Sequence, residues 1–250
     1  MSGEHMTSVE KVHVTPYPGL DLTVVKRGEG NPILVLHGGG GPASMREIEE
    51  HFAATNTVYA PIHPGWDDTP RPGWFSRVDD LVETYLDVLE DLGLTDVTLI
   101  GSSFGGWIAT EMALRDRGRQ ISKLILMDSI GPKLLHQSTN IPPASGRELW
   151  SSASVENEPL EGIDLLHTYI GPSQGDPKLF GRLHRIDVPV LLVWGENDQV
   201  VTPDFGREFQ SGFKDARFVE IEGGSHVPTE DQPEKTLRAM DAFLREEAGN

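Results

Sequence analysis

The feature that most constrains the fold of this chain is an apolar run that gives way to a helical pattern at residues 99–107. Within this stretch, Gly101 and Gly105 flank Ser103. A strand that bends sharply into a helix leaves no room for a Cβ beside the bend, and glycine lacks that atom. Such a bend lifts the serine hydroxyl above the edge of the sheet. The pattern therefore predicts a strand, a tight turn and a helix, with Ser103 as a candidate nucleophile.

A glycine-rich segment lies upstream of this turn. The apolar run at residues 33–36 leads into His37, the four glycines at 38–41 and Pro42. Successive glycines can present backbone N–H groups to a negative charge that develops on an oxygen atom. The segment lacks the Lys-Ser or Lys-Thr pair of a phosphate-binding loop, which argues against a nucleotide site. We expect His37 to brace the loop through a backbone hydrogen bond rather than to take part in chemistry.

An acid and an imidazole follow two apolar runs further along the chain. Asp198 comes just after the run at residues 190–194, and His226 follows the run at 217–221. A serine hydroxyl is a poor nucleophile at neutral pH, so it needs a base beside it and a group that orients the base. The candidate residues therefore occur in the chain order Ser103, Asp198, His226.

These motifs resemble those of the α/β-hydrolase family, and the resemblance covers nearly the whole chain. It implies that Ser103 is the nucleophile, that His226 acts as general base and then as general acid, and that Asp198 orients the imidazole. Asp128 also follows a buried apolar run, and some relatives take the acid from that earlier strand, so Asp128 stays open as an alternative. Asp198 is preferred because the segment around it matches the usual acid loop, although it could also cap the helix that follows.

The same resemblance implies an oxyanion hole built from two backbone amides. The amide of Phe104, directly after the serine, is one expected donor. The second comes from the glycine run, where Gly39 is our choice and Gly40 the fallback, because four successive glycines leave the register open.

Eight apolar runs separated by helical patterns predict the fold class. The interior runs are continuous rather than alternating, which is typical of parallel strands covered by helices on both faces. Strands that alternate with helices imply right-handed crossovers. We therefore expect an α/β fold with a doubly wound, mostly parallel eight-stranded sheet, helices on both faces and a short cap inserted after strand six. The expected strands lie near residues 12–14, 22–25, 33–37, 58–61, 97–101, 124–128, 190–194 and 218–221, and the expected helices near 44–53, 78–92, 104–115, 203–211 and 230–246.

Residues 129–185 break the alternation of strands and helices, with scattered Pro, Gly, Ser and Asn and weak helical patterns at 147–152 and 163–169. We expect this segment to be a small cap or lid, and residues 7–128 together with 186–248 to form the hydrolase core. A short cap leaves the pocket relatively open. The residues expected to bind substrate are Trp107, Trp150, Leu166, Tyr169 and Val227.

Composition narrows the range of partners. With 21 basic and 39 acidic residues, the formal charge of −18 repels nucleic acid and anionic membranes. The chain has no cysteine, which excludes disulfides, a thiolate nucleophile and cysteine-ligated metal sites. No stretch approaches the ~20 apolar residues of a membrane span, and no apolar signal segment opens the chain. We expect a cytoplasmic protein that acts on a small molecule and has no nucleic-acid or membrane partner. The sequence leaves open whether the protein forms a homodimer.

The motifs favour a serine hydrolase that cleaves small to medium carboxylic esters through an acyl-enzyme intermediate. One alternative is a carbon–carbon bond hydrolase of the meta-cleavage type. Residues 37–42 resemble the glycine loop of those enzymes. Those enzymes usually carry Asn before the serine and Trp shortly after the histidine, where this chain has Ser102 and Val227-Pro228-Thr229. Non-hydrolytic lyases, oxygenases and ligand receptors of the same fold form a further alternative. We expect no cofactor and no metal, since the segment with His63, Asp67 and Asp68 is more typical of turn and capping groups.

Overall fold

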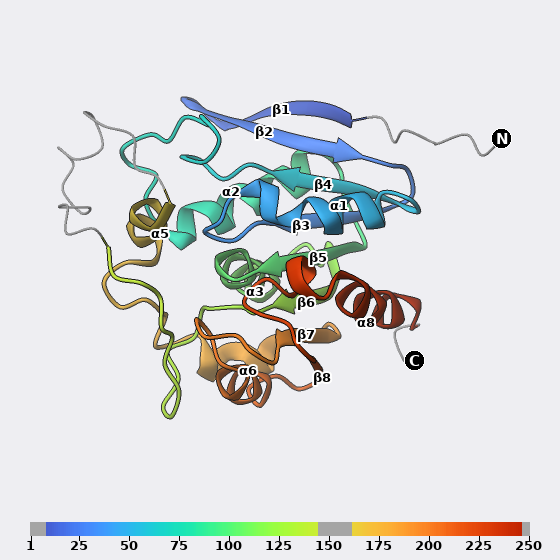
Figure 1. Ribbon diagram of the computed structural model, residues 1–250. Coiled ribbons are helices and arrows are strands. Elements are labelled where there is room, and N and C mark those ends of the chain that lie inside the picture. The colour runs from blue at the N-terminus through green and yellow to red at the C-terminus, as the bar shows by residue number, and fades with distance from the viewer. Residues whose placement is uncertain (1–8, 145–161, 247–250) are drawn as a thin grey trace.

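The computed structural model describes residues 9–144 and 162–246, which form one eight-stranded sheet flanked by helices (Figure 1). The strands lie side by side in the order β1-β2-β4-β3-β5-β6-β7-β8. β2 runs antiparallel to both β1 and β4, whereas all neighbouring pairs from β4 to β8 are parallel. The strands are β1 Val9–Tyr17, β2 Leu20–Arg27, β3 Asn31–Leu36, β4 Asn56–Pro61, β5 Val97–Ser102, β6 Ile121–Met127, β7 Val190–Gly195 and β8 Ala216–Ile221.

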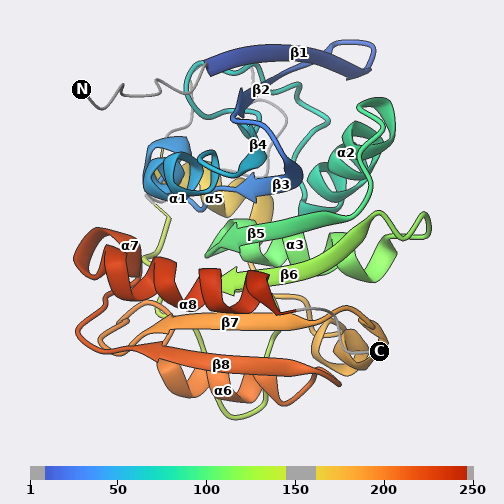
Figure 2. The same ribbon diagram turned by 90° about the vertical axis from the view of Figure 1, so that its right-hand side faces the viewer.

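Helices cover both faces of the sheet, as Figure 2 shows with α8 in front of the strands and α3 and α6 behind them. On one face, Ile48 of α1 and Met240 of α8 pack with Val35 of β3. On the other face, α2, α3 and α6 supply the larger apolar cluster. The helices are α1 Arg46–Phe52, α2 Val78–Asp91, α3 Phe104–Arg115, α5 Gly162–Ile170, α6 Pro203–Gln210, α7 Pro228–Asp231 and α8 Pro233–Arg245, with 3₁₀ turns η1 Pro42–Met45 and η2 Phe180–Arg185.

The continuous apolar runs of the sequence are explained by this double cover. Every residue of β5 and of β7 is buried, because both strands lie inside the sheet with helices above and below. The start of α2 is fixed by Asp80, whose carboxylate accepts hydrogen bonds from the backbone N–H groups of Ser76 and Arg77. Within the described ranges, no helix combines the length and apolar character that crossing a bilayer requires.

The expected fold class is confirmed, and each predicted apolar run overlaps an observed strand. Two helical predictions were too coarse. Residues 44–53 divide into η1 and α1. Residues 230–246 divide into α7 and α8, because Pro233 lacks the N–H that would continue one helix. In the expected cap, α5 matches the pattern at 163–169, η2 was not predicted, and 147–152 lies outside the described residues. The division into core and cap stays a prediction.

The parallel part of the sheet determines where the candidate residues meet. Parallel strands end at the same edge, so the loops that follow β3, β5, β6, β7 and β8 lie next to one another there. These loops carry His37 and the glycine run, Ser103, Asp128, Asp198 and His226. The edge therefore gathers all the candidate catalytic groups.

Candidate active site

Ser103 lies at the junction between β5 and α3 with φ 50° and ψ −113°, a left-handed conformation that non-glycine residues rarely adopt. The flanking glycines are required by close backbone approach. A Cβ on Gly101 would lie 2.4 Å from the Gly105 carbonyl oxygen, and a Cβ on Gly105 would lie 2.1 Å from the Leu36 carbonyl oxygen. The sharp bend inferred from the sequence is therefore present, with glycine on both sides for steric reasons.

Backbone hydrogen bonds hold the strained serine in place. The Ser103 N–H donates to the Met127 carbonyl at 2.9 Å, and the Ser103 carbonyl accepts from the N–H groups of Gly106 at 3.1 Å and Ile130 at 3.2 Å. Strain of this kind is of the order of 1–3 kcal/mol and persists where surrounding contacts over-determine the conformation. Here β6 and the loop after it supply those contacts.

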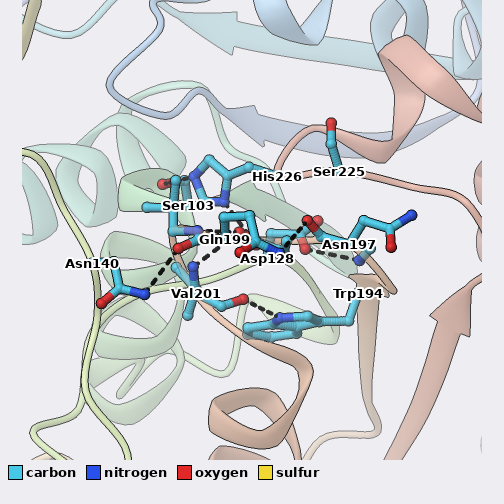
Figure 3. A network of polar contacts seen from close by, with 12 residues as sticks. Ser103, Asp128, Asn140, Trp194, Asn197, Gln199, Val201, Ser225 and His226 are labelled. Atoms are coloured by element: carbon cyan, nitrogen blue, oxygen red, sulfur yellow. Dashed lines mark hydrogen bonds and ion pairs between the residues drawn. The ribbon is translucent and has the colours of Figure 1, made fainter.

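His226 contacts both Ser103 and Asp198, and Figure 3 shows its ring beside Ser103. Its Nε2 lies 3.0 Å from Ser103 Oγ, and its Nδ1 lies 2.8 Å from Asp198 Oδ2. Because a carboxylate only accepts hydrogen bonds, Nδ1 carries the hydrogen and donates it to Asp198. The Nε2 lone pair is then free to accept the Ser103 hydroxyl hydrogen. In this tautomer the imidazole is placed to take a proton from the serine.

Asp198 is oriented by the loop that it begins. Its side chain is buried, and Oδ1 accepts backbone N–H groups from Val200 at 2.7 Å and Val201 at 2.9 Å. Val201 is held in turn by Trp194, whose indole N–H donates to its carbonyl at 2.8 Å. With Oδ1 occupied by backbone donors, Oδ2 is directed toward the imidazole.

Asp128 lies beside this pair but has a different partner. It follows β6, is fully buried and accepts the Gly195 N–H at Oδ1 with a distance of 2.9 Å. Burial raises the pKa of Asp128 well above its usual range, and the neighbouring Asp198 carboxylate raises it further. The hydrogen bond to the imidazole is made by Asp198, which is the acid preferred from the sequence.

His37 fixes the glycine loop through its imidazole. Its Nδ1 donates to the Gly38 carbonyl at 2.8 Å, and its Nε2 accepts the His63 N–H at 3.1 Å. The Gly38 carbonyl and the Gly39 N–H belong to one planar trans peptide and point in opposite directions. Fixing the carbonyl therefore also fixes the direction of the Gly39 N–H, one of the two expected oxyanion donors.

His63 connects this loop to helix α2. Its Nε2 donates to the His37 carbonyl at 3.0 Å, and its Nδ1 accepts the Tyr85 hydroxyl hydrogen at 2.5 Å. Burial lowers the pKa of His37 to about 4 and lowers the pKa of His63 as well, so both rings are neutral. Because both ring nitrogens are in use, His63 has no free lone pair to offer a metal ion together with Asp67 and Asp68.

Trp66 braces the next peptide of the glycine loop. Its indole N–H donates to the Gly39 carbonyl at 3.2 Å, and its ring stacks on Phe104 and on Tyr169. Sequence reasoning did not single out Trp66 or Tyr85. The available signal for Trp66 was its place in the proline- and glycine-rich loop after β4, at the same edge of the sheet as Ser103.

The residues expected to bind substrate contact different parts of the structure. Leu166 covers the glycine loop, since a Cβ on Gly39 would lie 3.1 Å from Leu166 Cδ2. The Tyr169 hydroxyl donates to the Pro64 carbonyl at 2.7 Å. Val227 is partly buried and packs against the apolar cluster on the α1 and α8 face. Trp150 lies outside the described residues. Their roles in substrate binding stay predictions.

A cavity of about 670 Å³ opens beside α3, between the start of α2 and the end of α5. Its described lining includes Trp107 and Tyr169 but neither Ser103 nor His226. The indole N–H of Trp107 is buried and has no hydrogen-bond partner among the described residues. Trp107, four positions after Ser103, borders the cavity, but the described lining does not include the candidate catalytic residues themselves.

Asp128, Asp198 and His226 bring three ligand-type atoms within 4.8 Å of one another. Two of these residues already bond to each other, with the imidazole hydrogen between them. Nδ1 of His226 carries a hydrogen in this arrangement and has no lone pair to offer a metal ion, and Nε2 is used by the contact with Ser103. We therefore assign no metal to this cluster.

Comparisons with known proteins agree with the fold. The pimeloyl-[acyl-carrier protein] methyl ester esterase of Nitrosospira multiformis is 26% identical, over 90% of this chain and 99% of its own. The 2-hydroxy-6-oxononadienedioate/2-hydroxy-6-oxononatrienedioate hydrolase 2 of Pseudomonas putida is 27% identical, over 87% of this chain and 89% of its own. An esterase structure from Exiguobacterium antarcticum superposes with a TM-score of 0.80 at 18% identity, over 95% of this chain and 100% of that one.

A family model described as the alpha/beta hydrolase family matches residues 33–239. That range runs from β3 through most of α8, so it includes every loop at the edge where Ser103, Asp198 and His226 meet. The chain belongs to the alpha/beta hydrolase family.

Proposed function

We propose that this protein is a serine hydrolase that cleaves small to medium carboxylic esters through an acyl-enzyme intermediate. The observation that carries the proposal is the hydrogen-bonded line from Asp198 through His226 to Ser103, with distances of 2.8 Å and 3.0 Å. A serine on a strained turn, with a correctly protonated imidazole beside it, is suited to nucleophilic attack on a carbonyl carbon.

In the first half of the reaction, Ser103 Oγ attacks the ester carbonyl while His226 Nε2 takes the hydroxyl proton. The carbonyl oxygen becomes an oxyanion, which the N–H groups of Phe104 and Gly39 receive. Phe104 is the first residue of α3, so its N–H has no partner within the helix. Collapse of the intermediate breaks the ester C–O bond, and the leaving alcohol takes the proton from His226.

In the second half, water attacks the acyl-enzyme carbonyl and gives a proton to His226 Nε2. The second oxyanion uses the same two amides. When it collapses, the bond to Ser103 Oγ breaks, the serine regains its proton from His226, and the carboxylic acid leaves. Asp198 stays ionised throughout and stabilises the imidazolium.

The ester substrate class is supported by relatives named as esterases. One matches nearly its full length and is named as a methyl ester esterase, and another is a solved esterase that shares the fold. Ester cleavage needs little beyond the serine, the imidazole, the acid and the oxyanion donors. Our proposal leaves the acyl and alcohol groups of the natural ester unspecified.

A second candidate is hydrolysis of a carbon–carbon bond in a vinylogous diketone. It is favoured by the Pseudomonas putida relative, whose name describes a hydrolase of hydroxy-oxo dienedioates, and by the glycine run at residues 38–41. Ser102 and Val227 stand where meta-cleavage hydrolases usually carry Asn and, shortly after the histidine, Trp. These two positions favour the ester over the diketone.

The test is intact-mass analysis after treatment with a fluorophosphonate probe, with wild type and Ser103→Ala compared. We expect one adduct on the wild type and none on the variant, and loss of ester turnover by roughly 10⁴- to 10⁶-fold in the variant. A panel of acyl esters and vinylogous diketones then separates the two candidates. Absence of labelling on folded wild type would overturn the proposal and favour a non-hydrolytic role. Faster turnover of diketones would favour the second candidate.

A further inference from the structure

Two buried carboxyl groups lie next to each other at the candidate active site. Asp128 follows β6 and Asp198 follows β7, and these strands are paired in the sheet. The side chains are 0% and 1% exposed, and their oxygen atoms lie within 4.8 Å of each other. Two ionised carboxylates this close together in a buried site repel each other strongly, which favours retention of one proton by the pair.

Hydrogen-bond donors decide which of the two carboxyls is ionised. Asp198 receives three, from the N–H groups of Val200 and Val201 and from Nδ1 of His226. Asp128 receives one, the Gly195 N–H at Oδ1, and its buried Oδ2 has no donor among the described residues. A carboxylate oxygen without a donor is costly when buried, whereas a protonated oxygen can itself donate.

The electrostatic surroundings agree with this assignment. Within residues 9–144 and 162–246, the ionisable groups beside Asp128 are Asp198 from the loop after β7 and His226 from the loop after β8. Burial raises the pKa of Asp128 most, and the charge of Asp198 raises it further, whereas the Gly195 N–H lowers it. The net shift is upward and favours the neutral form of Asp128.

We propose that Asp128 is a positioning residue whose neutral carboxyl group donates its O–H to Asp198 and accepts the Gly195 N–H. This inference rests on the proposed function only in its effect on catalysis. Through the two bonds, Asp128 ties the start of the acid loop to β6 and holds Asp198 facing His226. It also draws part of the negative charge of Asp198 away from the imidazole, which tunes how readily His226 accepts a proton.

The proposal predicts different outcomes for two substitutions of Asp128, and a role as the ionised acid does not. Asp128→Asn keeps both functions, because the amide oxygen can accept the Gly195 N–H and the amide N–H can donate to Asp198. Asp128→Ala removes both, leaving the Gly195 N–H and the Asp198 oxygen without their partner. We expect near wild-type kcat for Asp128→Asn and a loss of about tenfold to a hundredfold for Asp128→Ala.

The pH profile of fluorophosphonate labelling and of ester turnover is the decisive kinetic readout. Loss of the O–H donor concentrates negative charge on Asp198, so the acid limb of Asp128→Ala should move to higher pH, while that of Asp128→Asn stays in place. If Asp128 were an ionised group, Asp128→Asn would remove a negative charge beside the imidazole. Its acid limb would then move to lower pH and its activity would fall, which overturns the proposal.

Infrared spectroscopy tests the protonation state without any need for activity. Wild type near neutral pH should show the C=O stretch of a protonated carboxyl group that is missing from Asp128→Asn. Glu49→Gln is the matched control, because Glu49 is a buried carboxyl on α1 that pairs with Arg27 away from this site. Loss of the same band in both variants, or in neither, would overturn the assignment. A wild type that shows the band but resists labelling would refute the proposed function and leave the carboxyl pair intact.

Discussion

The Tyr85 hydroxyl donates to His63 Nδ1 at 2.5 Å and thereby connects helix α2 to the glycine loop beside Ser103. His63 bonds to both the carbonyl and the imidazole of His37, and His37 bonds to the Gly38 carbonyl. The direction of the Gly39 N–H therefore depends on a tyrosine from a different layer of the fold. Each bond in this series involves a neutral group, so it needs no counter-ion in the core.

Tyr85→Phe tests this series. The variant leaves the buried Nδ1 of His63 without a donor, so the free energy of unfolding should fall by about 1–3 kcal/mol. The Gly39 peptide should also be held less firmly in the variant. We therefore expect the labelling rate constant at saturating fluorophosphonate to fall by a larger factor than the affinity for the probe. Urea unfolding and labelling kinetics measure the two effects. Tyr59→Phe is the control, because Tyr59 on β4 is only partly buried and its hydroxyl takes no part in the series; equal effects of both variants would contradict the expectation.

Acid should destabilise the protein through the two buried imidazoles. Burial lowers the pKa of His37 from 6.5 to about 4 and also lowers that of His63. The unfolded chain binds these protons near pH 6.5 and the folded chain resists them, so the stabilisation is complete above about pH 6.5 and is lost as the pH falls toward 4. For His37 the loss is about 3 kcal/mol.

Urea unfolding at several pH values between about 7 and 4.5 measures this loss. His63→Gln should flatten the pH dependence of the free energy of unfolding. His13→Gln should leave it unchanged, because His13 is an exposed residue of β1. A wild-type stability that does not change over this range would show that the two rings are not held neutral.

Asp198→Asn should lower kcat by about 10³- to 10⁴-fold, because an amide can no longer stabilise the imidazolium and can reverse the imidazole tautomer. The fold should persist, since the Asn oxygen can still accept the N–H groups of Val200 and Val201. Steady-state ester kinetics and circular dichroism check both statements. Asp187→Asn is the matched exposed substitution, beside Lys214, and should keep full activity. A mild effect of Asp198→Asn would point to Asp128 as the acid.

Gly105→Ala should prevent stable folding or cost several kcal/mol, because the new Cβ would lie 2.1 Å from the Leu36 carbonyl oxygen and backbone atoms cannot move aside cheaply. Gly181→Ala is the control, since a Cβ there meets nothing within 4 Å. Thermal unfolding of both variants provides the measurement. Equal melting temperatures would contradict the steric explanation of the glycines around Ser103.

Features encoded by neighbouring residues were predictable from the sequence. The glycines around Ser103 and the continuous apolar runs each indicate a local conformation, and parallel pairing then brings the following loops to one edge. Even the break between α7 and α8 had a readable signal in Pro233, which ends a helix before it.

Contacts between distant segments could not be read in the same way. His63 and Tyr85 are 22 positions apart and meet only because α2 packs beneath the loop after β4. Asp128 was seen as a competitor of Asp198 for one role, whereas the structure places both side by side with different partners. Choosing between them needed the direction of each carboxyl group, which depends on tertiary packing rather than on local pattern.

The hydrogen bonds from Ser103 to Met127 and Ile130 have a consequence for how the protein loses activity. The serine cannot relax its backbone unless β5 separates from β6, and these are central strands of the sheet. Local melting at the site is therefore coupled to disruption of the whole core. In a denaturant titration, the reactivity of one side chain should disappear together with global structure, which makes a covalent probe a reporter of cooperative unfolding.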